Sequence, residues 1–152
     1  MRDYSDRARV ACELRMSGAN CAQAVVCSFA DRIGLPEETL MAAAGGFGGG
    51  VGGSHEEMCG ALSGGVLALS LLFPYAEGGD AAARKKVYGL SKRFRQRFLE
   101  TFGHTRCSSL LELRPGVSEK TAAAARLGIG GHCDIMIVTA VELVEGLLAE
   151  EQ

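Results

Sequence analysis

The apolar residues of the chain recur three or four positions apart, the spacing of a helix face, and no segment shows the strict alternation of a strand. Glycines and prolines divide this pattern into segments. We expect the main helices over residues 2–16, 21–33, 36–44, 55–72, 80–102 and 133–149, and shorter helical pieces over 105–113 and 118–126. The pattern predicts an all-α fold, with one domain over residues 1–152 built as a compact bundle of about five to seven helices and a Gly-rich loop.

Two of the expected helix starts carry capping boxes, in which a polar N-cap residue is followed three positions later by a glutamine or glutamate. Asn20 with Gln23 marks one start, and Ser54 with Glu57 marks the other. The second box is expected to open the helix over residues 55–72. Each of these starts lies close to a cysteine, so the helix N-termini are where chemistry is expected.

Four of the six cysteines lie near expected helix N-termini: Cys21, Cys59, Cys107 and Cys133. The partial positive charge at a helix N-terminus stabilises an anion, and this lowers the pKa of a thiol. We therefore expect four thiolates, the form that metal binding and disulfide exchange both need. Cys12 and Cys27 lie inside helices on apolar stripes and are predicted to be packing residues. The chain has no Cys-x-x-Cys pair, so neither a zinc ribbon nor a thioredoxin motif is present.

The tract over residues 45–53 contains seven of the 21 glycines. So much glycine cannot form a regular helix, and it predicts a loop with unusual backbone angles or a close approach to a neighbour. A phosphate loop is not supported, because no strand precedes the tract and no Gly-Lys-Ser/Thr follows it. We expect a loop that presents Cys59, against the alternative of a plain loop of small residues. Its amides can hydrogen-bond a thiolate or a cluster sulfur, so the candidate cofactor-binding positions are Gly48, Gly49, Gly50 and Gly60.

Histidines accompany two of the cysteines. His55 precedes Cys59 by four residues, and His132 adjoins Cys133. Either imidazole can tune a thiol or ligate a metal, and the alternative is a solvent-facing residue near a helix start. His104 is a weaker candidate. The basic residues over 85–97 are interpreted as a solvated helix face, with docking of a partner as the alternative.

The bulk properties narrow the class of function. The net charge of −2 favours neither a nucleic-acid partner nor a membrane surface. The first residues form no apolar signal region, and the longest apolar stretch, residues 66–73, is far shorter than the roughly 20 residues that span a bilayer. We expect a cytoplasmic protein without membrane insertion, whose cysteines are metal ligands or redox thiols. No Ser-His-Asp or paired-carboxylate pattern supports a hydrolase, and the sequence leaves open whether the protein is an enzyme.

Residues 59–64 have the form Cys-Gly-Ala-x-x-Gly. With one cysteine upstream at a helix start, two downstream and the glycine tract just before, the chain resembles the C_GCAxxG_C_C family of redox-active proteins. The resemblance implies that the redox thiols of the family fall on Cys21, Cys59, Cys107 and Cys133. A related module resembles the cluster-bearing part of split-Soret cytochromes, which implies an iron–sulfur site, although this chain has no Cys-x-x-Cys-His haem attachment site. Family genes often neighbour transporter genes, which implies a transporter as a possible partner.

Three hypotheses follow for the function. The leading one is that the four thiolates bind an iron–sulfur cluster, or another metal such as zinc, for electron transfer or sensing with an unknown electron donor or acceptor. The second is a dithiol–disulfide redox protein without metal, in which Cys59 pairs with one other cysteine. The third is a non-enzymatic accessory domain of a transporter. We also expect a homodimer, because clusters and close Gly-rich packing often lie at subunit contacts.

Overall fold

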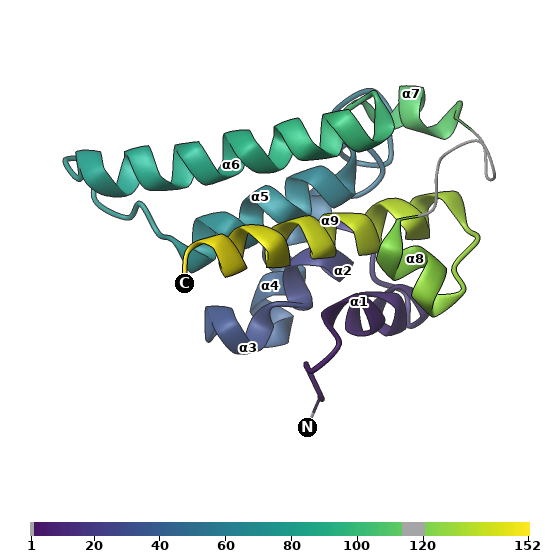
Figure 1. Ribbon diagram of the computed structural model, residues 1–152, viewed down its shortest axis with the longest axis horizontal. Coiled ribbons are helices and arrows are strands. Elements are labelled where there is room, and N and C mark those ends of the chain that lie inside the picture. The colour runs from purple at the N-terminus through teal and green to yellow at the C-terminus, as the bar shows by residue number, and fades with distance from the viewer. Residues whose placement is uncertain (1, 114–120) are drawn as a thin grey trace.

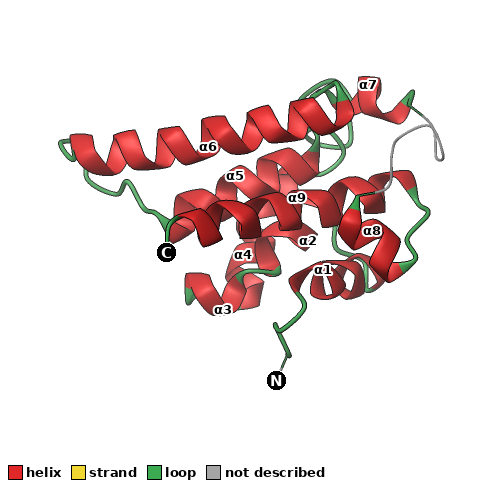
Figure 2. Cartoon of the chain, viewed as in Figure 1, coloured by secondary structure: helices red, strands yellow, loops and turns green. Residues whose placement is uncertain are grey.

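The computed structural model describes residues 2–113 and 121–152 (Figure 1). Within these residues the regular structure is helical, with a single isolated β-bridge and no strand (Figure 2). The elements are α1 (Arg7–Met16), α2 (Cys21–Cys27), α3 (Ala30–Ile33), α4 (Glu37–Ala44), the 3₁₀ turn η1 (Gly45–Phe47), α5 (Gly60–Leu72), α6 (Ala81–Phe102), α7 (Cys107–Leu111), α8 (Ala122–Leu127) and α9 (His132–Glu150). The prediction of an all-α bundle is confirmed.

Helices α2, α5 and α9 contact one another and form the centre of the bundle. Helix α6 packs on α5 and α9 and runs along the outer edge of the molecule (Figure 1). Helices α1 and α8 pack on α9, whereas α4 packs on α2. The buried face of α6 follows the predicted apolar stripe, which consists of Val87, Leu90, Phe94, Phe98 and Phe102. The apolar faces of the helices meet in one continuous core.

Glycines let α5 lie unusually close to its neighbours. A Cβ atom added to Gly64 would lie 2.6 Å from the carbonyl oxygen of Ala22 in α2. On the next residue, Gly65, an added Cβ would lie 2.2 Å from Cζ of Phe94 in α6. Helix α5 is therefore held between α2 and α6 at a distance that a larger residue would not allow.

The capping box at Asn20 is present as predicted. The Asn20 side chain accepts a hydrogen bond from the amide of Gln23 at 2.9 Å, and the Gln23 side chain accepts one from the amide of Asn20 at 2.9 Å. The helix that this box opens ends earlier than the expected 21–33 span. Ser28 donates its hydroxyl to the carbonyl of Val25 at 2.6 Å, and α2 and α3 are separated there. A serine hydroxyl that takes a backbone acceptor competes with helix continuation.

The predicted helix start at Ser54 is wrong. Helix α5 begins at Gly60, with Cys59 as its N-cap. The Ser54 hydroxyl donates to the carbonyl of Gly50 at 2.8 Å, and the next residue, His55, has φ 63°, which is left-handed. A residue in this conformation cannot belong to a right-handed helix. The capping motif is therefore used inside a loop that continues to Cys59.

The remaining boundaries differ less. Helix α1 begins at Arg7, after the N-cap Asp6, and not at residue 2. Helix α8 covers the later part of the segment expected over 118–126, and residues 118–120 lie outside the described part. No helix in the described ranges is long and apolar enough to cross a membrane.

Replacing Gly64 by Ala should destabilise the protein by about 1–3 kcal/mol, because the new methyl group meets the Ala22 carbonyl. Gly89→Ala in α6 is the matched control, since nothing beyond adjacent backbone of its own helix lies within 4 Å of the added Cβ. The control should be more stable than the parent by about 0.5–1 kcal/mol, the usual gain for Gly→Ala in a helix interior. Urea unfolding measures both changes. Equal effects from the two variants would contradict the close α2–α5 contact.

Candidate functional site

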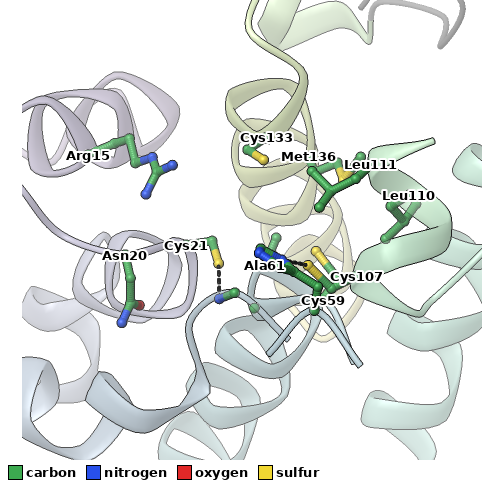
Figure 3. Close-up of a pocket in the computed structure, with 13 residues that line it drawn as sticks. Arg15, Asn20, Cys21, Cys59, Ala61, Cys107, Leu110, Leu111, Cys133 and Met136 are labelled. Carbon is green, nitrogen blue, oxygen red and sulfur yellow. Dashed lines mark hydrogen bonds between the residues drawn. The ribbon is translucent and has the colours of Figure 1, made fainter. Parts of the chain in front are cut away.

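Four cysteines from four helices line one cavity of ≈ 150 Å³, called the thiol cavity below (Figure 3). Cys21 is the first residue of α2 and Cys59 is the N-cap of α5. Cys107 is the first residue of α7, and Cys133 is the second residue of α9. The expected helix-start positions are thus confirmed for Cys21, Cys107 and Cys133. Cys59 also lies at a helix start, but at Gly60 and not after the predicted cap Ser54. The fold directs these four N-termini to one place.

The glycine tract reaches the thiol cavity at Gly49, which is one of the lining residues. Residues 49–53 all have left-handed backbone angles, including Val51 with φ 68°. The amide of Gly53 donates to the carbonyl of Gly48 at 3.0 Å, and that of His55 donates to the carbonyl of Gly49 at 2.8 Å, so the loop curls on itself. The amide of Gly49 donates to Sγ of Cys21 at 3.5 Å. The expectation of unusual backbone angles is confirmed, and the amide of Gly49 is hydrogen-bonded to the Cys21 thiol.

Two glycines are needed because the thiols leave no room for a side chain. A Cβ on Gly60 would lie 2.2 Å from Sγ of Cys21, and a Cβ on Gly50 would lie 2.6 Å from Cβ of Cys107. Gly48 is close to a different group, because its Cβ would lie 2.5 Å from the amide side chain of the N-cap Asn20. The glycines predicted to bind a cofactor therefore lie against the cysteines of the cavity or, for Gly48, against the N-cap residue Asn20 that precedes Cys21. Contact with a cofactor stays a prediction.

A short antiparallel contact sets the relative positions of Cys59 and Cys107. Met58 and Arg106 form an isolated β-bridge. On either side of it, the amide of Cys59 donates to the carbonyl of Thr105 at 2.8 Å, and the amide of Cys107 donates to the carbonyl of Glu57 at 2.9 Å. Residues one step from the bridge on both segments share a face, so the two cysteines lie on the same side. Sequence reasoning missed this bridge, because one pair of residues leaves no alternating pattern.

The three histidines have different surroundings. His55 is exposed and lines the thiol cavity, with its Nδ1 3.3 Å from Sγ of Cys107. His132 is buried, and its Nε2 is hydrogen-bonded to the carbonyl of Leu110, which links the start of α9 to α7. His104 is exposed and is not part of the cavity lining. Of the three candidates, His55 is the one that the structure brings to the thiols.

The expected lowering of the thiol pKa values is not found. Burial raises the pKa of Cys59 to about 12, although hydrogen bonds from the backbone amides of Ala61 and Leu62 act in the opposite direction. Burial also raises the pKa of Cys107 and of Cys133, and the charges of neighbouring thiolates add to both effects. Removal from water and mutual repulsion outweigh the partial charge of the helix ends. Without a cation, these three thiols favour the neutral form.

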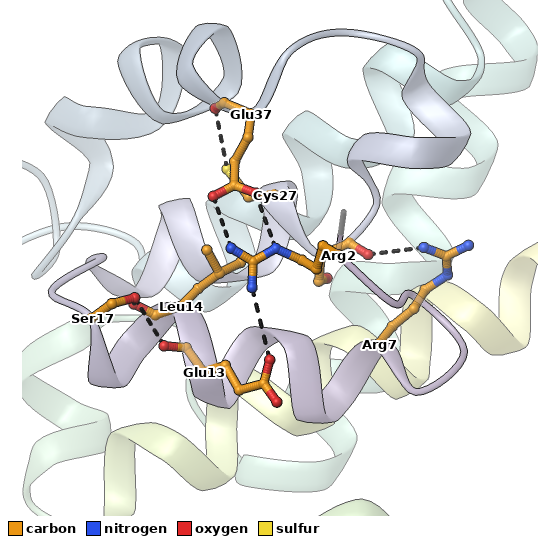
Figure 4. Close-up of polar contacts among 8 residues, drawn as sticks. Arg2, Arg7, Glu13, Leu14, Ser17, Cys27 and Glu37 are labelled. Carbon is orange, nitrogen blue, oxygen red and sulfur yellow. Dashed lines mark hydrogen bonds and ion pairs between the residues drawn. The ribbon is translucent and has the colours of Figure 1, made fainter.

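The two remaining cysteines lie elsewhere. Cys27 is fully buried and its thiol donates to the carbonyl of Glu37 at 3.8 Å, while the Glu37 carboxylate pairs with Arg2 (Figure 4). Burial raises the pKa of Cys27 to about 12 and also raises that of the partly buried Cys12. Neither residue lines the thiol cavity. Their surroundings are those of packing residues.

The spacing of the ligand atoms limits the kind of metal that can bind. In the described ranges, no group of three or more His, Cys, Asp or Glu side chains is arranged to hold a metal ion. A tetrahedral zinc site with Zn–S bonds of about 2.3 Å needs sulfurs about 3.8 Å apart. In a cluster the thiolates are shared among several irons, so they need not converge on one point. All six cysteines carry free thiols.

A family model described as "Putative redox-active protein (C_GCAxxG_C_C)" matches residues 19–147. The matched range contains the four cysteines of the thiol cavity and the glycine tract, and it leaves out Cys12. No curated protein and no solved structure matches the chain.

The pKa of Cys59 leads to a prediction for thiol reactivity. In the metal-free, reduced protein, alkylation of Cys59 by iodoacetamide at pH 8 should be at least tenfold slower than in the urea-unfolded protein. The thiolate is the reactive form, and a pKa near 12 keeps its fraction very small. The rate should rise steadily with pH from 7 to 10, since all of this range lies below the pKa. Mass spectrometry of the Cys59 peptide measures it, and a rate that levels off near pH 8 would contradict the assignment.

Proposed function

The chain belongs to the C_GCAxxG_C_C family of redox-active proteins, and we propose that its thiol cavity holds an iron–sulfur cluster used for electron transfer. Cys21, Cys59, Cys107 and Cys133 are the proposed ligands. The observation that carries the proposal is that four thiols from four separate helices line one cavity, whereas the two other cysteines do not. Chance packing of small apolar residues gives no reason for this selection.

The donor set of the cavity supports a cluster over a single ion. Thiolates are soft ligands that suit iron–sulfur clusters, and four of them complete a [2Fe–2S] or [4Fe–4S] centre. The described side chains are not arranged to hold one metal ion, which disfavours a mononuclear zinc site. The raised pKa values give a bound cation of either kind the same task, because it would supply the positive charge that deprotonates the buried thiols.

The residues around the thiols have separate tasks in this proposal. The amide of Gly49 and the imidazole of His55 lie against the sulfurs of Cys21 and Cys107, where hydrogen bonds stabilise added negative charge. Leu110 and Met136 contribute apolar surface to the cavity. A cluster bound there would supply one-electron transfer, and polar contacts and burial are the means by which a protein sets its potential.

Replacing any one of the four proposed ligands by Ser should lower the iron and sulfide content of anaerobically purified protein several-fold. A serine hydroxyl is a poor replacement for a thiolate in a cluster. Cys12→Ser is the matched control and should retain the full content, because Cys12 is outside the cavity. Metal analysis and visible absorption measure the loss. A colourless parent protein that contains neither iron nor sulfide would overturn the proposal, and one that contains only zinc would replace the cluster by a structural metal.

Gly60 provides a test that leaves all four ligands in place. Gly60→Ala should lower cluster content several-fold, because the added methyl group occupies the position of the Cys21 sulfur. Gly46→Ala is the control, since nothing lies within 4 Å of its added Cβ and its backbone is not left-handed. Iron and sulfide are measured per folded protein, with helicity followed by circular dichroism. Full loading of the Gly60→Ala protein would show that Cys21 does not need this close contact.

A dithiol–disulfide protein is the second candidate, and the β-bridge is the observation that favours it. The bridge between Met58 and Arg106 places Cys59 and Cys107 on the same side of two paired segments. Oxidation would join the two sulfurs and pass two electrons and two protons to a disulfide or another two-electron acceptor. A metal-free protein that loses two free thiols on mild oxidation, with the two cysteine peptides linked, would favour this function over the cluster.

A further inference from the structure

Helix α6 concentrates the positive charge of the molecule. It carries seven basic residues and one acidic residue, Glu100, so its net charge is +6, and the rest of the chain carries −8 to reach the total of −2. The helix lies along the outer edge of the bundle, where solvent reaches its polar face (Figure 1). The small net charge of the protein is therefore the sum of a strongly cationic helix α6 and an acidic remainder.

The basic residues of α6 fall on two flanks with different surroundings. One flank faces the end of α9, where Glu150 and Glu151 pair with Lys86, Arg93 and Arg97. On the other flank, no acid among the described residues pairs with a basic side chain. Its four basic side chains are exposed and make no ion pair with any described residue: Arg84, Lys85, Lys92 and Arg95.

The unpaired flank forms one continuous line, called the α6 stripe below. Arg84, Tyr88, Lys92 and Arg95 follow one another at steps of four, four and three residues, which keeps them on one side of the helix. The line is about 16 Å long at 1.5 Å per residue. Tyr88 is 65% exposed among the charges, and Lys85 borders it. A row of cations around an exposed aromatic ring is typical of a docking surface.

We propose that the α6 stripe docks an acidic electron-carrier protein that exchanges electrons with the thiol cavity. This partner assignment rests on the proposed function. Four residues of chain after α6 lead to Cys107, and the last of them, Arg106, is also exposed and has no ion pair with a described residue. Helix α6 thus ends next to α7, which supplies one of the four thiols (Figure 1). Charge complementarity of this kind raises association rates and orients the partner.

Charge balance favours a compact acidic protein over other anionic partners. A nucleic acid carries a charge about every 1.7 Å and extends well beyond a 16 Å stripe, so it would also meet the acidic remainder of the molecule. A bilayer is likewise a broad anionic surface, and the three basic side chains and one tyrosine of the α6 stripe offer little apolar area to insert. A carrier with a local acidic patch matches the stripe in size and avoids this repulsion.

The test uses an acidic [2Fe–2S] ferredoxin as the probe and two triple variants of the full chain. Arg84→Gln, Lys92→Gln and Arg95→Gln together neutralise the stripe. Lys86→Gln, Arg93→Gln and Arg97→Gln together remove the same number of charges from the flank paired with α9, which makes them the matched control. For each protein, two quantities are measured at low ionic strength and at about 0.5 M salt: the binding of ferredoxin, and the bimolecular rate constant for electron transfer.

The stripe variant should bind and exchange electrons about tenfold more slowly than the parent at low ionic strength, and the difference should vanish in high salt. The control variant should slow binding and electron transfer by less than about threefold, which is less than half of the stripe variant's effect on a logarithmic scale. Equal losses from both variants would show that only net charge matters and would overturn the docking site. Stripe-dependent binding of anionic vesicles or duplex DNA, without binding of ferredoxin, would also overturn it.

The failure of this proposal can be told apart from failure of the proposed function. Ferredoxin binding is measured on the protein as purified, with its iron content determined separately. If ferredoxin binding depends on the stripe in a protein that contains no iron, the docking proposal stands and the cluster proposal is overturned. Normal cluster content with ferredoxin binding that is the same in the parent and the stripe variant would retain the cluster and remove the docking site.

Discussion

The structure depends on the absence of side chains where the start of α5 meets the start of α2. Gly60 faces the Cys21 sulfur so closely that a methyl group would overlap it, and Gly64 faces the Ala22 carbonyl one turn further on. Because these two positions are bare, the N-termini of α2 and α5 can lie side by side. That contact brings two cysteines together and leaves the glycine tract to close the wall beside them.

This arrangement puts the thiols in an electrostatic conflict. Helix starts and backbone amides favour thiolates, but burial and the nearness of the other thiols favour the neutral form, and burial is the stronger effect at Cys59. Protein stability alone gives little reason to gather four thiols in one cavity. A cation bound among them would reverse the balance, since it stabilises the deprotonated form of each ligand. The proposal of a metal centre in the cavity rests partly on this conflict.

The two surfaces of interest are built from different parts of the fold. The thiol cavity is built from helix starts, the glycine loop and one β-bridge, and contacts between distant segments bring these parts together. The α6 stripe belongs to a single helix, whose apolar face is buried against α5 and α9. Burial of that face fixes the direction of the opposite one. The core thus orients the α6 stripe, although its basic side chains make no ion pair with a described residue.

Local pattern in the sequence determined the helical class, the capping box at Asn20, the apolar face of α6 and the helix-start positions of Cys21, Cys107 and Cys133, because each depends on neighbours within about one turn. Tertiary structure decided the rest. Ser54 does not cap a helix because its hydroxyl donates a hydrogen bond to the Gly50 carbonyl within a loop of left-handed backbone angles. The pKa of Cys59 rose because burial is a property of the packed molecule. The placement of Cys59 and Cys107 on the same side of two paired segments depends on a β-bridge between segments far apart in the chain, which no local pattern encodes.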